Sequence, residues 1–129
     1  MSRKIGLVTL LVNDYDEAIE YYVNKVNFRL VEDVKMSESN RFVVVEPSGS
    51  TASQILLAQA VTEQEKLAVG NQAGGRVFLF LNTDDFYRDY NTMKEKGVTF
   101  LETPREEVYA TVAVFQDMYG NKWDLLQRK

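Results

Sequence analysis

The side chains of this chain that are able to do chemistry are carboxylates, lysines, arginines and tyrosines, because its 129 residues include no His and no Cys. Without imidazole there is no Ser-His-Asp triad and no histidine metal ligand. Without thiols there is no nucleophilic Cys, no zinc ribbon, no iron–sulfur site and no disulfide framework. Any catalysis would therefore depend on carboxylates, Lys, Tyr, Arg or backbone groups.

Local spacing alone raises none of these groups to a catalytic site. Glu106 and Glu107 beside Arg105 are typical of a solvated loop. Glu46 and Glu102 fall near the ends of expected strands, and nothing in their spacing marks them as bases. A candidate site can therefore be chosen only once the strands and helices that position these side chains have been identified.

The overall charge narrows the classes of partner. The chain has 15 Lys and Arg against 19 Asp and Glu, a formal charge of −4, which argues against a surface that neutralises nucleic-acid phosphates. No apolar run approaches the ~18 residues of a membrane span. The charged first residues lead straight into a strand pattern rather than a signal-peptide core. We expect a cytoplasmic protein without nucleic-acid or membrane partners.

The first half of the chain reads as β-α-β-β-β. An apolar, β-branched run at 7–12 is followed by helix-capping residues at 13–16 and by an apolar stripe at helical spacing that ends at Asn27. Three further strands are expected at 28–34, 41–45 and 54–60, with a turn at 47–50.

The same order returns in the second half. A short polar helix or loop at 62–69 and the glycine-rich segment 70–75 (GNQAGG) mark the boundary. A strand at 76–81, a helix from Phe86 that stops at Gly97, and strands at 98–101, 111–115 and 123–126 complete the pattern. Pro104 and a charged loop lie between the last strands.

Individual residues support an internal duplication. Asn13 and Asn82 are 69 positions apart, Glu32 and Glu102 are 70 apart, and the strand at 41–45 matches 111–115 at the same offset of 70. One offset that holds within two residues through several elements indicates two copies of one unit.

Two such units, with the entry Asn-Asp-Tyr-Asp-Glu-Ala-Ile-Glu-Tyr-Tyr at 13–22 and the exit Asp117-x-Tyr-Gly-Asn-Lys-Trp-Asp124, resemble the vicinal oxygen chelate superfamily of glyoxalases, bleomycin-resistance proteins and extradiol dioxygenases. The resemblance implies an α+β fold in which two tandem β-α-β-β-β modules pair their sheets into a cup-shaped half-barrel. Helices would cover the outside and a ligand would sit inside. It implies a single domain over 1–129, made of module 1–61 and module 75–129.

In the metalloenzymes of this family, a divalent metal is held at the cup floor by one residue from the first and last strand of each module. The resemblance places those positions at Leu7, Leu56, Arg76 and Asp124, with Gln54 on the same face as Leu56. Leucine offers no ligand atom, and Arg76 puts a fixed positive charge where the cation would bind. We therefore predict neither a metal nor another cofactor.

The mapping puts Arg76 and Asp124 on neighbouring positions of the cup, where a guanidinium and a carboxylate can pair. This pair would either replace the metal structurally or leave Arg76 partly free to hold an oxygen of a small ligand. Both interpretations stay open at this point.

Strand alternation predicts which side chains share the cup. Thr9 would follow Leu7 on that face, Phe78 and Phe80 would follow Arg76, and Tyr109 would reach the mouth. We predict Arg76, Asp124, Phe78, Phe80, Thr9 and Tyr109 as ligand-binding residues. The alternative is that the two phenylalanines fill the cup completely.

Three functions remain open. The first is a metal-free protein that binds a small, partly aromatic molecule, as in the bleomycin-resistance branch. The second is a lyase or isomerase of the glyoxalase type that uses Arg76 as electrophile and a carboxylate such as Asp124 as base. The third is a structural homologue that binds nothing. The family also implies a homodimer, with which exposed strand edges at 41–45 and 111–115 would be consistent.

Overall fold

The computed structural model describes residues 2–49 and 53–129, which form two compact units, Met1–Val69 and Gly70–Lys129. Each unit is a mixed α+β structure with its own sheet, and the second repeats the order of the first. The predicted fold class of two tandem β-α-β-β-β modules is confirmed. Part of the predicted turn at 47–50, Ser50, lies outside the described residues. That the two modules form one domain stays a prediction.

The described residues of the first unit form seven elements, listed here in chain order: β1 (Leu7–Val12), α1 (Tyr15–Glu20), a π-helical turn (Tyr21–Lys25), β2 (Phe28–Lys35), β3 (Arg41–Pro47), β4 (Gln54–Gln59) and α2 (Glu63–Ala68). Its sheet has the order β1-β4-β3-β2, in which β1 and β4 are parallel and the other pairs antiparallel. The first strand has the bounds predicted from the sequence.

Capping chemistry sets the ends of the first helix. The Asp14 carboxylate accepts the backbone N–H of Glu17 at 2.9 Å, which satisfies one of the free donors at a helix start. The helix then widens into the π-helical turn, which the sequence pattern did not predict. Asn27 ends it in the left-handed conformation at φ 62°, as predicted.

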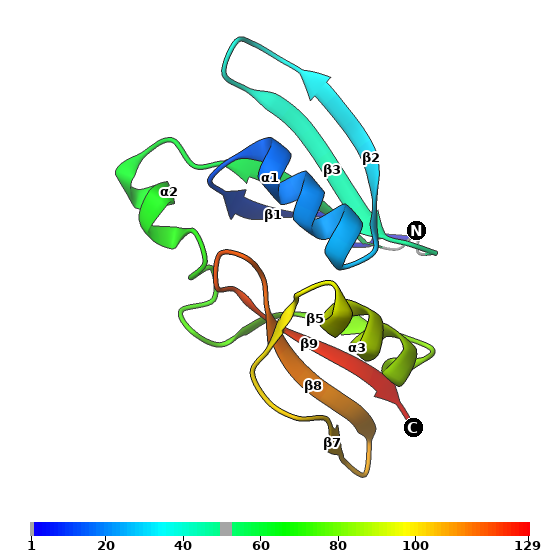
Figure 1. Ribbon diagram of the computed structural model, residues 1–129. Helices are drawn as coiled ribbons and strands as arrows, with labels where there is room; N and C mark the ends of the chain where they lie inside the picture. The colour runs from blue at the N-terminus through cyan, green and yellow to red at the C-terminus, as the bar shows by residue number, and fades with distance from the viewer. Residues whose placement is uncertain (1, 50–52) are drawn as a thin grey trace. The chain divides into compact units, whose positions relative to one another are not determined.

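Strand alternation separates the two faces of the first sheet. Leu10 and Val12 of β1 are fully buried, whereas Leu7 and Thr9 are exposed. The buried set faces the side on which α1 places Ala18. Figure 1 shows α1 lying alongside the strands of its unit. The opposite face, with Leu7 and Thr9, is the one that we predicted from the sequence to line the ligand-binding cup.

The second unit contains six elements, listed in chain order: β5 (Val77–Asn82), α3 (Phe86–Glu95), β6 (Thr99–Phe100), β7 (Arg105–Glu106), β8 (Ala110–Gln116) and β9 (Lys122–Arg128). Its sheet has the order β5-β9-β8-β6, with β7 also paired to β8. The parallel β5–β9 pair repeats the β1–β4 pair. No helix within 2–49 and 53–129 is long and apolar enough to cross a membrane.

Three predicted elements of this unit need correction. The fifth strand begins at Val77, one residue after Arg76, and its register against β9 shifts between Val77 and Leu79. The strand expected at 98–101 is only Thr99–Phe100. The expected charged loop contains the short strand β7, which pairs with β8 through Arg105 and Val112.

A row of aromatic rings in contact joins α3 to one face of the second sheet. Ring centroids lie 4.5 Å apart for Tyr90 and Phe100, 5.6 Å for Phe100 and Phe115, and 5.8 Å for Phe115 and Trp123. Such contacts add to the burial of the rings themselves. Figure 1 shows α3 lying across this sheet. This face therefore carries the aromatic core of the second unit, whereas the opposite face carries a smaller buried cluster of Ala110, Val112 and Leu126.

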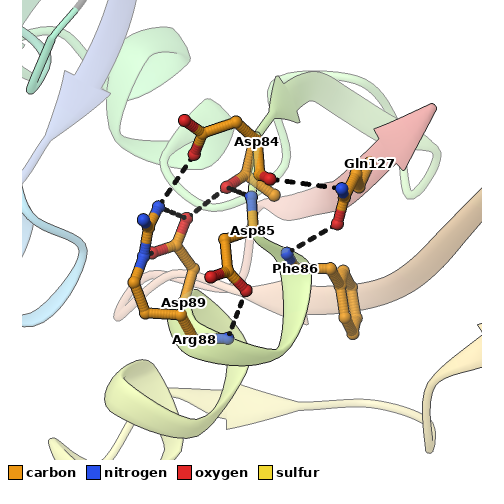
Figure 2. Close-up of polar contacts among 7 residues, drawn as sticks. Asp84, Asp85, Phe86, Arg88, Asp89 and Gln127 are labelled. Carbon is orange, nitrogen blue, oxygen red and sulfur yellow. Dashed lines mark hydrogen bonds and ion pairs between the residues drawn. The ribbon is translucent and has the colours of Figure 1, made fainter.

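The N-terminus of α3 is held by polar side chains, shown in Figure 2. Asp85 accepts the backbone N–H of Arg88 at 3.2 Å, and the Arg88 guanidinium is paired with Asp84 and Asp89. The amide of Gln127, reaching from β9, accepts the N–H of Phe86 at 2.9 Å. The last strand thus fixes where α3 begins.

The Asp-x-x-Gly-Asn signature forms the turn between β8 and β9. One carboxylate oxygen of Asp117 accepts the N–H groups of Tyr119, Gly120 and Asn121 at 2.9–3.0 Å, and the other accepts the Asn121 side-chain amide. Asn121 Oδ1 in turn accepts the N–H of Gln72 at 3.2 Å. The most family-specific residues of the sequence are therefore structural, and they orient the strand that carries Asp124.

Candidate functional site

The face of the second sheet opposite α3, called here the open face, brings two of the predicted site residues together. Phe80 of β5 lies directly opposite Asp124 of β9, and Val114 of β8 lies opposite Asp124 on its other side. The Phe80 side chain is 61% exposed. A carboxyl group therefore stands between an exposed aromatic ring and an apolar side chain.

The Asp124 carboxyl group is poorly solvated. Its Oδ1 atom is buried and has no hydrogen-bond partner among the described residues. Burial raises the pKa of Asp124 above its usual value; the positive charge of Arg105 opposes this rise, and the negative charge of Glu102 adds to it. Asp124 is therefore a weaker acid than an exposed aspartate. A hydrogen bond donated by a bound molecule would give its Oδ1 atom the partner that it lacks in the described part of the chain.

Glu102 and Arg105 are the charged neighbours of Asp124 that sequence reasoning missed. Both carboxylate oxygens of Glu102 accept the Nε–H of Arg105 at 3.1 Å, and Oε2 also accepts the backbone N–H of Val114 at 3.0 Å. The Arg105 Nη1 donates to Glu107 at 3.0 Å. The missing signal was the pairing of β7 with β8, which places Arg105 beside Val112, on the strand face that also bears Val114.

The predicted pair of Arg76 and Asp124 is not formed, and this prediction was wrong. Arg76 precedes β5, is exposed, and has no ion-pair partner among residues 2–49 and 53–129. The register shift between Val77 and Leu79 breaks the alternation that was assumed to carry the face of Phe80 back to Arg76. The guanidinium that acts on Asp124 belongs to Arg105 instead.

The other three predicted residues lie at separate places. Phe78 is half-buried within the irregular part of β5. Tyr109 is mostly exposed at the bend before β8, where its carbonyl accepts the N–H of Lys129 at 3.0 Å. Thr9 belongs to the first unit, where it is paired with Leu56 on the face opposite the buried Leu10.

The first sheet carries a buried carboxylate of a different kind. Glu46 of β3 is only 1% exposed, and it shares a face with Leu56 and Gln54. It accepts the side-chain amide of Gln54 at 3.0 Å and is ion-paired with Arg29 of the adjacent strand. Both oxygens are satisfied, so Glu46 stabilises its own sheet and leaves no acceptor open.

The residues at the metal positions of the family do not fit a metal ion. Two of the four, Leu7 and Leu56, have no ligand atom, and Arg76 carries a permanent positive charge. In the described part of the chain no group of three or more acidic side chains is placed to hold an ion. Of the four positions, only Asp124 offers an oxygen atom that could bind a metal ion.

Comparison with known proteins agrees with this fold. Residues 4–125 match the family model of the Glyoxalase/Bleomycin resistance protein/Dioxygenase superfamily. A protein of Shewanella frigidimarina (strain NCIMB 400) without an assigned function is 56% identical over 128 residues, covering 98% of this chain and 95% of the relative.

Two solved structures are similar along their whole length. The crystal structure of UcmS2 has a TM-score of 0.85 at 26% identity and covers 98% of both chains. That of TnmS3, an antibiotic binding protein from Streptomyces sp. CB03234, has a TM-score of 0.81 at 26% identity and covers 100% of this chain and 98% of its own. With its duplicated β-α-β-β-β units and the family match over nearly its full length, this chain belongs to the Glyoxalase/Bleomycin resistance protein/Dioxygenase superfamily.

Proposed function

We propose that this protein binds a small, partly aromatic molecule without a metal ion, in the manner of the antibiotic-binding members of its superfamily. The observation that carries the proposal is the exposed ring of Phe80, placed directly opposite Asp124 on the open face. The similarity to TnmS3 over the full chain supports the same class of ligand.

The exposure of Phe80 is informative because the other phenylalanines of its unit are placed differently. Phe86 and Phe115 are at most 1% exposed; Phe86 stacks on Tyr90 within α3, and Phe115 stacks on Trp123 within the sheet. An exposed ring on a rigid strand offers an apolar stacking surface at little cost in conformational freedom. Such a ring suits a planar ligand.

The composition of the family's metal positions supports a mode of binding without a metal. A ligand that reaches the open face meets the exposed ring of Phe80, apolar side chains and the Asp124 carboxyl group, which is the only oxygen ligand left at the metal positions. Affinity would then come from stacking, apolar burial and a few directed hydrogen bonds. Phe78, Thr9, Tyr109 and Arg76 are proposed as further ligand contacts.

The lyase or isomerase hypothesis is less well supported. It needs an arginine electrophile next to a carboxylate base, and Arg76 and Asp124 do not form that pair. Arg105 is the nearer cation, but Glu102 and Glu107 already hold it. The hypothesis of a structural homologue that binds nothing requires Phe80 to be packed away, and the ring is exposed.

The test is a thermal-shift screen of aromatic drugs, small anions and divalent metals, because a ligand specific to the folded state raises the melting temperature. Hits are titrated against wild type, Phe80→Ala and Tyr87→Ala. Tyr87 is a matched control, since it is an aromatic residue 48% exposed that lies on α3 rather than on the open face.

We expect aromatic hits, at least tenfold weaker binding by Phe80→Ala, and unchanged binding by Tyr87→Ala and after chelation of metals. One tightly held divalent ion per purified chain would contradict metal-free binding. Equal affinity of wild type and Phe80→Ala would remove the open face as the site.

A further inference from the structure

We infer that the ligand presents a hydrogen-bond donor, an amine or a hydroxyl group, to Asp124 while its aromatic ring lies on Phe80. The inference rests on the proposed function and narrows it to aromatic molecules that carry such a donor at the edge of the ring. Aromatic carboxylates and plain aromatic hydrocarbons would be poor ligands.

The first step is the unsatisfied acceptor. Asp124 Oδ1 is buried without a hydrogen-bond partner in the part of the chain that the structure describes. Nearly all buried polar atoms in proteins have a partner, and leaving one unpaired costs stability. The two fully buried acids, Glu46 and Asp117, follow this rule, since each accepts hydrogen bonds through both oxygens. Asp124 is therefore the exception that needs a partner.

The second step is that the residues opposite Asp124 on the neighbouring strands supply no donor. On either side of Asp124 the opposite residues are Phe80 and Val114, whose side chains have no polar atom. Arg105 acts on Asp124 by charge, but its Nε and Nη1 donate to Glu102 and Glu107. Asp124 as a residue is half-buried, so a molecule on the open face can reach it, and rotation about χ2 exchanges its two oxygens.

The third step is the sign of the local charge. Asp124, Glu102 and Glu107 bring three carboxylates against the single guanidinium of Arg105. Such a surface repels an anion and favours a donor, above all a protonated amine. The class of ligand follows from this balance together with the ring of Phe80.

The experiment uses four naphthalene probes of nearly equal size: 2-naphthylmethylamine, 2-naphthol, 2-methylnaphthalene and 2-naphthoate. They present a charged donor, a neutral donor, no donor and an anion. Dissociation constants are measured with wild type, Phe80→Ala, Asp124→Leu and Asp124→Asn. Glu106→Gln is the matched control, because it removes one negative charge outside the open face, where Glu106 binds Tyr87 and Thr111.

We expect wild type to bind the amine and the naphthol about tenfold or more tightly than 2-methylnaphthalene, the gain typical of one directed hydrogen bond to a charged group, and to bind the naphthoate most weakly. Asp124→Leu abolishes the preference for donors and keeps the binding of 2-methylnaphthalene. Asp124→Asn retains an acceptor, so its preference for donors should lie between those of wild type and Asp124→Leu. Glu106→Gln should behave as wild type.

Two failures are distinguishable. If all four probes bind wild type equally and Asp124→Leu changes nothing, while Phe80→Ala weakens every probe, the role of Asp124 is overturned and the proposed function stands. If no probe binds wild type, or if Phe80→Ala leaves all affinities unchanged, the proposed site fails and the inference fails with it.

Discussion

Gln127, near the end of the last strand, fixes the start of α3 through Phe86. Its Oε1 accepts the backbone N–H of Phe86 at 2.9 Å, and its Nε2 donates to the carbonyl of Asp84 at 3.2 Å. Gln59, 68 positions earlier, donates to the carbonyl of Asn13 at 3.2 Å in the first unit. The duplicated glutamine thus has the same task in both units, which is to tie a strand-to-helix turn to the strand beside it.

Replacement of Gln127 by Ala should destabilise the protein by about 2 kcal/mol, because a helix N–H and a turn carbonyl both lose their partner. Urea unfolding measures the effect. Arg128→Ala, at the exposed next residue, is the control and should stay within about 0.5 kcal/mol of wild type. Equal stability of Gln127→Ala and wild type would show that the tie contributes nothing.

Gly70 and Gly74 form a matched pair for separating collision from backbone strain. Both have positive φ, +76° and +66°. A Cβ at Gly70 would lie 1.8 Å from the carbonyl oxygen of Tyr119, whereas a Cβ at Gly74 would meet nothing within 4 Å. We expect Gly74→Ala to cost about 1 kcal/mol, from the left-handed conformation alone.

Gly70→Ala should cost several times more, about 3 kcal/mol or above, because the carbonyl it meets belongs to the backbone and must move. Unfolding in urea compares the two variants directly. Similar losses for both would mean that the turn at Tyr119 yields easily, which would contradict its role in holding Asn121 and β9 in place.

The pH dependence of stability tests the burial of Asp124. Because burial raises its pKa, the folded protein binds this proton more tightly than the unfolded chain, whose Asp pKa is about 3.9. Stability contributed by this group is present below the unfolded pKa and is lost as the pH rises through the folded pKa. Asn at position 124 does not ionise and avoids the loss.

The free energy of unfolding of Asp124→Asn, relative to wild type, should therefore increase from below pH 4 toward neutral pH. Denaturant unfolding at a series of pH values measures the difference. Glu38→Gln, at an exposed residue, is the control for the removal of one carboxyl group. A difference for Asp124→Asn that falls with rising pH would mean that the folded state favours the ionised carboxylate.

Arg41 joins three elements of the first unit. From β3 it donates to Asp33 of β2 at 2.7 and 3.1 Å, and to Asp16 of α1 at 3.0 Å. The hydrogen bond from Arg41 is the main reason that the pKa of Asp33 is lowered, so this stability is present above the unfolded pKa and is lost as the pH falls through the folded pKa.

Arg41→Ala should cost about 1 kcal/mol at neutral pH, an amount suited to a partly exposed pair with fork geometry, and the loss should shrink on acidification. Denaturant unfolding at pH 7 and pH 3 gives both values. Lys35→Ala removes the more exposed pair with Glu38 and should cost less than about 0.5 kcal/mol. A loss for Arg41→Ala that is independent of pH would point to packing against Tyr15 instead.

Much of the fold was predictable because its signals are local. An apolar, β-branched run located β1, the capping residues at 13–16 located the start of α1, and Asn27 located the end of the first helical segment. The repeat then supplied the second unit without further assumptions. By contrast β7 has two residues, and only its pairing with β8 defines it, so no local pattern reveals it.

The candidate site was predictable only where alternation holds. Phe80 and Asp124 are neighbours because β5 and β9 are regular between Leu79 and Asn82. The displacement of Arg76 follows from one irregular residue at the beginning of β5, and the arrival of Arg105 follows from a loop that folds back on β8. Irregularities of this kind depend on tertiary packing rather than on the type of one residue.

The segment that joins the two units has a consequence for any division of the chain. Gln72 and Gly75 are tied to the last turn of the second unit, through Asn121 Oδ1 at 3.2 Å and the Lys122 ammonium at 3.1 Å. The glycines of this segment give it the composition of a flexible linker, but its hydrogen bonds make it part of the second unit. If the two halves of the chain are expressed as separate fragments, the division should therefore lie before Gly70. The second fragment then keeps the hydrogen bonds of this segment to its last turn.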